Sequence, residues 1–109
     1  MKNILIVEDD EHIQKSLKEI LEMKDYCVYQ SYTQKEALHM IDEKMQLIIL
    51  DIQLPDGNGI VLCQHIRQTF SMPILFLTCR NDEETIVEGL NAGGDDYVCK
   101  PFGIKELLA

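Results

Sequence analysis

The stretch LIILDIQLPDGNG, residues 47–59, joins an aliphatic run to a single acid and then to a turn. The four aliphatic residues from Leu47 to Leu50 predict a strand that is covered on both faces. Asp51 follows directly, and Pro, Gly and Asn residues then mark a turn. Asp51 therefore has two interpretations. It starts the turn, or it lies at the mouth of a site and takes part in its chemistry.

The same kind of run recurs along the chain. Five short apolar runs predict strands over residues 4–7, 26–30, 47–50, 74–77 and 97–99, the second of them nearer an edge of the sheet. Helical patterns lie between or after them, over residues 11–23, 59–69, 83–92 and 104–109, and a further one follows Thr33. Thr33 and Glu36 form a T-x-x-E capping box, and Ala37, Leu38 and Ile41 follow as the expected inner face. This alternation predicts an α/β fold with a parallel sheet, right-handed crossovers and helices on both faces.

Length and charge restrict the classes of function. The 109 residues fit one domain, and the pattern ends in mid-helix, so we expect residues 1–109 to be one domain of a longer protein. There are 19 acidic and 10 basic residues, a formal net charge of -9. Such a surface disfavours direct binding to DNA or to anionic membranes, and it is compatible with a cation site.

The cysteines and the N-terminus indicate a cytoplasmic protein. Cys27, Cys63, Cys79 and Cys99 are scattered and show no metal-type spacing, as is typical of reduced thiols. The start MKNILIVEDD turns acidic too early for a signal peptide, and no apolar run has membrane-spanning length.

Reactive or charged residues follow four of the five predicted strands. They are Glu8, Asp9 and Asp10 after the first strand, Asp51 after the third, Thr78 after the fourth and Lys100 after the fifth. Because sites in open parallel sheets form beyond the carboxyl ends of the strands, these side chains would meet at one edge. Any one of them could simply mark where a strand reaches the surface, but the set indicates a site.

The charges at this edge predict a cation. Two carboxylates about 4 Å apart repel by about 4 kcal/mol at an effective dielectric constant of about 20. Glu8, Asp9 and Asp51 therefore need positive charge among them, which Lys100 and a hard divalent ion such as Mg²⁺ would supply. A metal, an amine and a hydroxyl around a carboxylate nucleophile form an arrangement suited to phosphoryl transfer.

Four segments in this order resemble the receiver domain of two-component response regulators. They are ILIVEDDEHI, LIILDIQLPDGNG with its D-x-x-[LM]-P-x-x-[DN]-G pattern, PILFLTCR and GGDDYVCKPF. The resemblance covers the whole chain. It implies a doubly wound, flavodoxin-like (βα)5 fold whose five strands lie in the order 2-1-3-4-5.

The resemblance also implies a role for each acidic residue. Asp51 would accept a phosphoryl group from a sensor histidine kinase as an acyl phosphate. Asp9 would ligate Mg²⁺ directly, Glu8 would help through water, and the backbone carbonyl of Gln53 would be a further ligand. Asp10 could replace Asp9 if the alignment were shifted by one residue, but it reads better as a cap of the first helix.

The remaining implied roles concern the switch. Thr78 would hydrogen-bond the phosphoryl group, Tyr97 would rotate inward behind it, and Lys100 would pair with its oxygens. Pro101 would follow a cis peptide bond, as is usual in this family. Cys79 departs from the family's usual Ala and would narrow access to the phosphoryl group.

The ending DDYVCKPFGIKELLA resembles the OmpR/PhoB-type transcription regulators. That resemblance implies a homodimer on phosphorylation, through the face made by the fourth helix, fifth strand and fifth helix. Asp95, Asp96 and Lys105 would be charged members of this face. A winged-helix DNA-binding domain would follow, beyond residues 1–109, and control transcription.

Three other functions fit the sequence less well. An aspartyl phosphohydrolase often carries a second Asp two residues after its nucleophile, where this chain has Gln53. A nucleotide or flavin binder would need a Gly-rich loop where EDDEH stands. A receiver used only for protein contacts would lack Asp51 or Lys100. The sequence therefore predicts a phosphoacceptor signalling domain that catalyses only its own phosphorylation and dephosphorylation.

Overall fold

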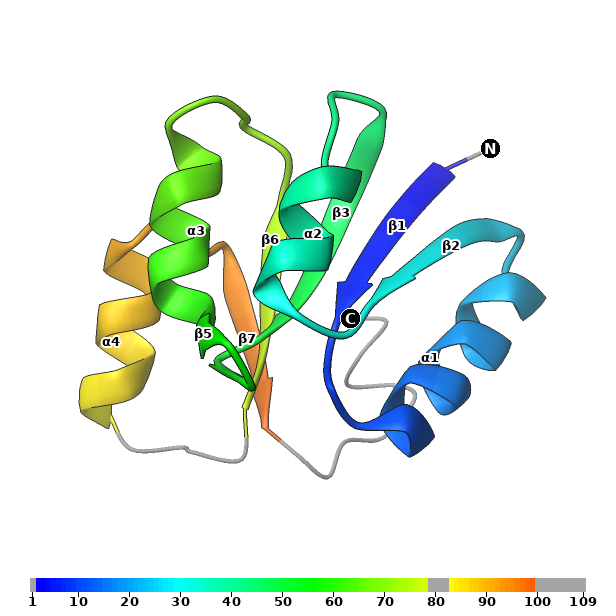
Figure 1. The fold of residues 1–109 in the computed structure, drawn as a ribbon, viewed down its shortest axis with the longest axis horizontal. Helices are drawn as coiled ribbons and strands as arrows, with labels where there is room; N and C mark the ends of the chain where they lie inside the picture. The colour runs from blue at the N-terminus through cyan, green and yellow to red at the C-terminus, as the bar shows by residue number, and fades with distance from the viewer. Residues whose placement is uncertain (1, 79–82, 100–109) are drawn as a thin grey trace.

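A five-stranded parallel sheet forms the centre of the computed structural model, which describes residues 2–78 and 83–99 (Figure 1). Its strands are β1 (Lys2–Val7), β2 (Tyr26–Ser31), β3 (Met45–Asp51), β6 (Ile74–Thr78) and β7 (Asp96–Cys99). The helices are α1 (Glu11–Met23), α2 (Gln34–Met40), α3 (Gly59–Arg67) and α4 (Glu83–Asn91). The strands lie in the order β2-β1-β3-β6-β7, which is 2-1-3-4-5 in chain order, as predicted. The helix predicted over 104–109 falls outside the described residues.

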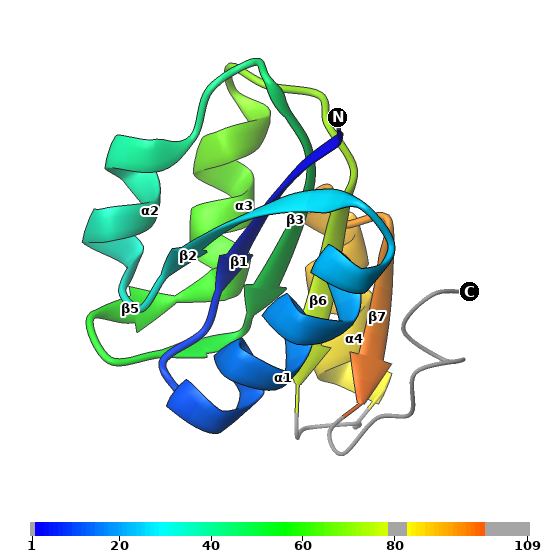
Figure 2. The same ribbon diagram turned by 90° about the vertical axis from the view of Figure 1, so that its right-hand side faces the viewer.

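Successive side chains along each central strand enter opposite layers of the core. Leu5 and Val7 pack with residues of α2 and α3, whereas Ile4 and Ile6 pack with the inner face of α1. Figure 2 shows α1 on one side of the sheet, and α2 and α3 on the other. Because both faces are covered, the strands read as continuous aliphatic runs in the sequence.

The predicted helix faces are partly wrong. Ala37 and Ile41 pack in the core as predicted, but Leu38 is exposed, because α2 ends at Met40 and Ile41 lies in extended backbone beyond it. The edge position of β2 is confirmed, since β1 is its partner in the described sheet.

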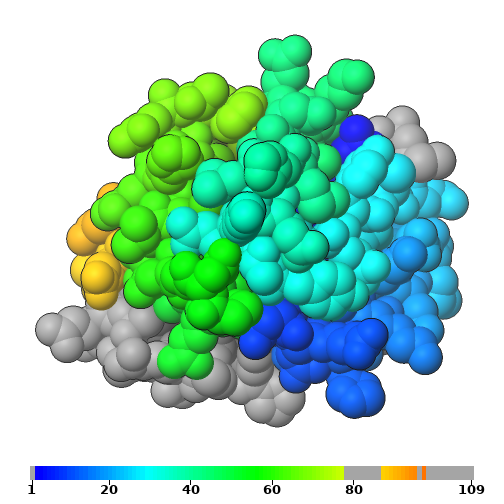
Figure 3. Space-filling model, viewed as in Figure 1, coloured from blue at the N-terminus to red at the C-terminus, as the bar shows by residue number. Residues whose placement is uncertain are grey.

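A small hairpin that the sequence analysis did not predict follows Asp51. Its strands, β4 (Gln53–Leu54) and β5 (Gly57–Asn58), are antiparallel and joined by Pro55 and Asp56. Strands of two residues carry too little periodicity to be recognised in a sequence. Figure 3 shows this green segment lying against the cyan atoms of α2.

Asp56 joins this hairpin to the start of α2. Its carboxylate accepts hydrogen bonds from the backbone N–H groups of Gln34 and Lys35, at 2.8 Å and 3.1 Å. Thr33 accepts from Glu36 N, while the Glu36 carboxylate accepts from Tyr32 N, one residue earlier than a capping box requires. The first turn of α2 is thus capped partly by its own residues and partly by the segment after Asp51.

We expect Asp56→Asn to lower the urea midpoint of unfolding at neutral pH, because it removes the charge and one acceptor at the start of α2. The hydrogen bond from Gln34 N, with that from Lys35, holds the pKa of Asp56 below its ordinary value. This stabilisation is therefore complete above the unfolded pKa of about 3.9 and is lost as pH falls through the lower folded pKa. The wild-type and variant midpoints should converge in acid.

Urea titrations at several pH values check this expectation, with Glu43→Gln as the matched loss of an exposed acid. Equal midpoints for Asp56→Asn and wild type at neutral pH would show that the contact contributes nothing.

Candidate functional site

Three carboxylates meet at the carboxyl edge of the sheet. Glu8 follows β1 directly, and Asp51 is the last residue of β3. The two strands are neighbours, with Val7 opposite Leu50, so their ends lie side by side. One carboxylate oxygen from each of Glu8, Asp9 and Asp51 lies within 4.8 Å of the other two.

The three carboxylates lie close together, and two of them are shielded from water. Glu8 is fully buried and Asp51 is 5% exposed, whereas Asp9 is open to solvent. The backbone N–H of Asp9 donates to Glu8 Oε2 at 3.0 Å, and that of Gln53 donates to Asp51 Oδ1 at 3.2 Å. Three negative groups this close repel strongly where water is excluded. Their all-oxygen donor set fits a hard divalent cation, so the cluster could hold one.

Asp10, the alternative to Asp9, has a different role in the structure. It is the N-cap of α1, and its Oδ1 accepts hydrogen bonds from His12 N and Ile13 N at 2.9 Å and 3.3 Å. The cap prediction is confirmed. The carboxylates that share the cluster with Asp51 are those of Glu8 and Asp9.

The turn after Asp51 is built around Asn58 and Gly59. Asn58 is the N-cap of α3, and its Oδ1 accepts a hydrogen bond from Ile60 N at 2.7 Å. Gly59 N donates to the carbonyl oxygen of Ile52 at 2.7 Å. A Cβ atom at position 59 would overlap the backbone carbonyl oxygen of Asp51. Glycine is therefore required because the helix start touches the backbone of the acid itself.

The remaining predicted site residues are described to different extents. Thr78 ends β6 one residue beyond Leu77, which pairs with Asp51, so its backbone reaches the same edge. Tyr97 lies on β7 and is 36% exposed. Lys100 and three other predicted positions, Cys79, Pro101 and Lys105, lie outside the described residues, and Asp96 is described only as the first residue of β7.

Asp95, predicted on a dimer face, also has an intramolecular role. Its Oδ2 accepts from Arg67 Nη2 and from Ile74 N, both at 2.8 Å, while its side chain stays 57% exposed. Arg67 also donates to the carbonyls of Gly93 and Met72, at 2.8 Å and 2.6 Å. One side chain thus joins the end of α3 to the turns before β6 and β7.

Three polar residues that have no role predicted from the sequence hold parts of the backbone together. They are Gln14, Asp56 and Arg67. The position of Gln14 could have been noticed in the sequence. It lies three and seven residues before Leu17 and Leu21, on the same helix face, so a polar residue interrupts the apolar stripe of α1. Nothing local distinguishes Asp56 or Arg67, because their partners lie more than 20 residues away or on loop carbonyls.

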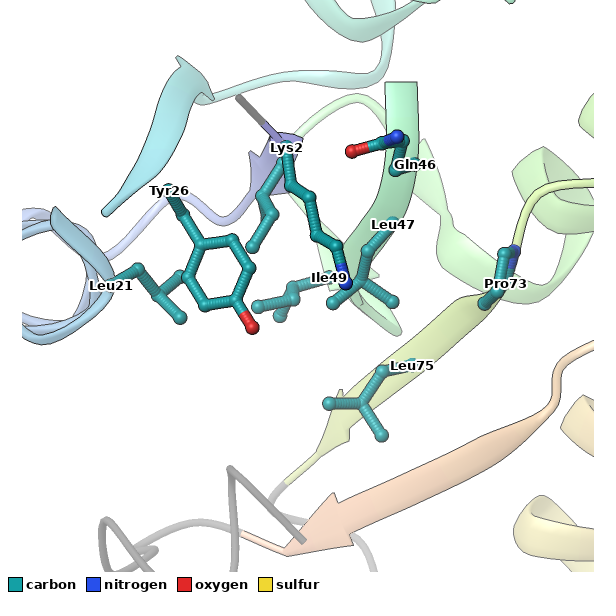
Figure 4. Close-up of a pocket in the computed structure, with 9 residues that line it drawn as sticks. Lys2, Leu21, Tyr26, Gln46, Leu47, Ile49, Pro73 and Leu75 are labelled. Atoms are coloured by element: carbon teal, nitrogen blue, oxygen red, sulfur yellow. The ribbon is translucent and has the colours of Figure 1, made fainter. Parts of the chain in front are cut away.

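One apolar hollow among the described residues lies away from the carboxylates. Its volume is about 400 Å³, and Figure 4 shows Lys2 beside Leu47 and Ile49, and Tyr26 beside Leu21 of α1. Leu75 lines it from the next strand. The lining comes mainly from the amino-terminal halves of the strands, opposite the Asp51 edge. It offers no carboxylate, so it is not where the predicted chemistry would occur.

Among the described residues, Cys27 and Cys63 belong to no group of side chains that could hold a metal ion. Cys27 is half-buried and Cys63 is buried. Burial raises the pKa of the Cys63 thiol, which keeps it protonated and unreactive. Among the described residues, Glu8, Asp9 and Asp51 are the one group of three or more His, Cys, Asp or Glu side chains close enough to share a cation.

Comparison with known proteins decides the family. The model of the response regulator receiver domain matches residues 4–109. The chain belongs to this family. Its receiver sequence is 48% identical to the transcriptional regulatory protein YrkP of Bacillus subtilis over 97% of the chain and 46% of YrkP. It is 40% identical to CpxR of Escherichia coli over 100% of the chain and 47% of CpxR.

The solved structures agree with the sequence relatives. A two-component response regulator from Clostridium difficile superposes with a TM-score of 0.96 at 38% identity, covering 99% of this chain and 90% of that one. The receiver domain thus spans about half the length of the curated transcriptional regulators it matches, which are of the OmpR/PhoB type. No helix within residues 2–78 and 83–99 is long and apolar enough to cross a membrane.

We expect Gly59→Ala to destabilise the receiver domain by about 2 kcal/mol, as is typical when added atoms overfill a packed site. The new methyl group must displace the Asp51 carbonyl or the start of α3. Urea unfolding measures the cost, with Gly57→Ala as the control because a Cβ there meets only the movable Gln34 side chain. Equal stability of Gly59→Ala and wild type would mean that this close approach is absent.

Substitutions of Asp9 and of Asp10 should differ in their effects on stability and on Mg²⁺ binding. Asp10→Ala removes a helix cap and should cost about 1 kcal/mol of stability, with Mg²⁺ affinity unchanged. Asp9→Ala should weaken Mg²⁺ binding at least about tenfold without lowering stability in EDTA, since it relieves repulsion. Urea unfolding and calorimetric Mg²⁺ titration test both. The reverse pattern would make Asp10 the ligand.

Proposed function

We propose that this receiver domain accepts a phosphoryl group on Asp51 in a Mg²⁺-dependent reaction. The observation that carries the proposal is the near-buried Asp51 carboxylate, within 4.8 Å of ligand atoms of Glu8 and Asp9. An aspartate that only started a turn would be expected to lie in solvent, away from other carboxylates. The strand that ends in Thr78 reaches the same edge, where a hydroxyl is expected to meet the phosphoryl group.

Glu8, Asp9 and the backbone carbonyl of Gln53 are the groups that would hold Mg²⁺ together with Asp51. When bound, the ion would offset their charge and orient the phosphoryl oxygens. Asp9 is the exposed member, so an incoming group can approach from its side. The backbone N–H of Gln53 donates to Asp51 Oδ1 and would help to orient the carboxylate for attack.

In the transfer step, an oxygen of Asp51 forms a bond to phosphorus while the bond from phosphorus to the donor breaks. The donor is the phosphohistidine of a sensor kinase, and its ring nitrogen keeps the electron pair of the broken bond. The Asp51 carboxylate gives up no proton in this step because it reacts ionised. Thr78 and Lys100 would then bind the new phosphoryl oxygens, Thr78 by a hydrogen bond and Lys100 by its charge.

The domain is therefore proposed to be a switch rather than a hydrolase with many turnovers. Gln53 occupies the position where a proton-transferring acid would be needed, and an amide neither gives nor takes protons at neutral pH. The acyl phosphate would then last long enough to bias the equilibrium between two conformers.

The output face is proposed to comprise α4, β7 and residues 104–109. Val87 and Leu90 are 47% and 39% exposed, and Tyr97 on β7 is 36% exposed. Exposed apolar residues suit a protein contact, and Asp95, Asp96 and Lys105 would be charged members of the proposed dimer face. In the whole protein, a cytoplasmic regulator, this homodimer would place a separate DNA-binding domain on its target.

Incubation with acetyl phosphate and Mg²⁺ should add one phosphoryl group to the wild-type domain, detected by intact-mass spectrometry. The adduct should be absent without Mg²⁺ and absent from Asp51→Ala. Asp56→Ala serves as the matched control, because it removes an acid from the same loop but outside the cluster.

Two outcomes would contradict the proposal. Rapid release of inorganic phosphate without an adduct would indicate hydrolase turnover. Neither adduct nor phosphate release would indicate a domain used only for protein contacts.

A further inference from the structure

Gln14 is a fully buried polar side chain on the first turn of α1, facing the carboxyl ends of β1 and β2. Its Nε2 lies within hydrogen-bond distance of three backbone carbonyls, those of Ser31 at 2.7 Å, Glu8 at 3.0 Å and Ile6 at 3.2 Å. Asp10 is the N-cap of this helix, four residues before Gln14. This amide thus joins α1 to the ends of two strands.

The contact with the Glu8 carbonyl bears directly on the acidic cluster. The peptide group between Glu8 and Asp9 has its carbonyl held by Gln14 and its N–H directed at Glu8 Oε2. The backbone N–H of Glu8 donates to Ser31 O at 3.1 Å, the same carbonyl that Gln14 reaches. The backbone joining the two carboxylates is therefore fixed on both sides.

The amide oxygen of Gln14 shows that packing alone does not explain why a glutamine is buried at this position. Gln14 Oε1 is buried and has no hydrogen-bond partner among the described residues. Burying an acceptor without a partner is unfavourable, and a methionine of similar size would fill the space without that cost. The donor side of the amide is what the structure uses.

We infer that Gln14 is a positioning residue for the cation site, an inference that rests on the proposed function. It holds the Glu8–Asp9 peptide in the orientation that brings both carboxylates to Asp51. Without its donor the buried Glu8 carbonyl loses this partner, and the peptide turns toward another donor or toward water. That rotation carries the Asp9 N–H away from Glu8 Oε2 and separates the two ligands.

The test is Mg²⁺ binding by the whole chain carrying Gln14→Met, which keeps the volume and removes the donors. We expect the dissociation constant for Mg²⁺, measured by calorimetric titration, to rise about tenfold, as is typical when a group that orients a metal ligand is lost. Acetyl phosphate labelling should slow at low Mg²⁺ and recover at saturating Mg²⁺. A residue that only stabilises the fold would not produce this dependence.

Leu17→Val is the matched control, because it disturbs buried packing on the same helix without touching the Glu8 carbonyl. It should lower the urea midpoint in EDTA and leave the Mg²⁺ constant unchanged. If Gln14→Met fails to fold, Gln14→Asn gives the same test with an amide one methylene too short to reach the carbonyls.

The outcomes distinguish the two proposals. A wild-type Mg²⁺ constant in a folded Gln14→Met or Gln14→Asn variant would overturn the role of Gln14 and leave the proposed function standing. Absence of saturable Mg²⁺ binding by wild type would overturn the proposed function, and the role of Gln14 with it.

Discussion

Mutual repulsion among the carboxylates of Glu8, Asp9 and Asp51 is the constraint on which the site depends. Two of these groups are withdrawn from water and all three are close together, an arrangement that a folded chain avoids unless the backbone enforces it. The enforcement is visible in the structure. Adjacent parallel strands deliver Glu8 and Asp51 to one edge, and hydrogen bonds hold the backbone on either side of them.

The surrounding structure can be understood as support for that arrangement. The aliphatic runs of β1 and β3 are buried on both faces, which leaves these strands little freedom to slide and move the acids apart. The segment after Asp51 is anchored to α2 by Asp56 and to α3 by Asn58. At the other end of the sheet, Arg67 holds the turns that lead into β6 and β7. The acidic cluster and the Arg67 contacts thus lie at opposite ends of the sheet.

Much of the architecture could be predicted because its determinants are local. The alternation of aliphatic runs with helical patterns is enough for the parallel sheet, and the bounds of α1 match the prediction, since Asp10 marks its start. The convergence of Glu8, Asp9 and Asp51 followed from the rule that parallel strands end at one edge. The resemblance to receiver domains supplied the strand order, which alternation alone does not determine.

What could not be predicted depends on partners far apart in the chain. Asp56 looks like a turn residue until α2 is placed beside it, and Arg67 looks like a surface charge until Gly93 and Asp95 are placed beside it. Leu38 was wrongly placed in the core because its three-residue spacing from Ile41 suits a helix that includes both, whereas α2 ends at Met40. The sequence pattern does not determine how the side chains of Thr78 and Lys100 are arranged, and the structure does not describe them.

The residue that fits at position 59 is determined by where the backbone of the reactive residue Asp51 lies. Gly59 takes no part in charge or proton transfer, but the backbone of Asp51 occupies the space that any side chain there would need. Variation at position 59 is therefore limited by the placement of the acid eight residues earlier, and not by the stability of α3 itself. A designer who transferred the acidic cluster to another sheet would have to transfer this empty volume with it.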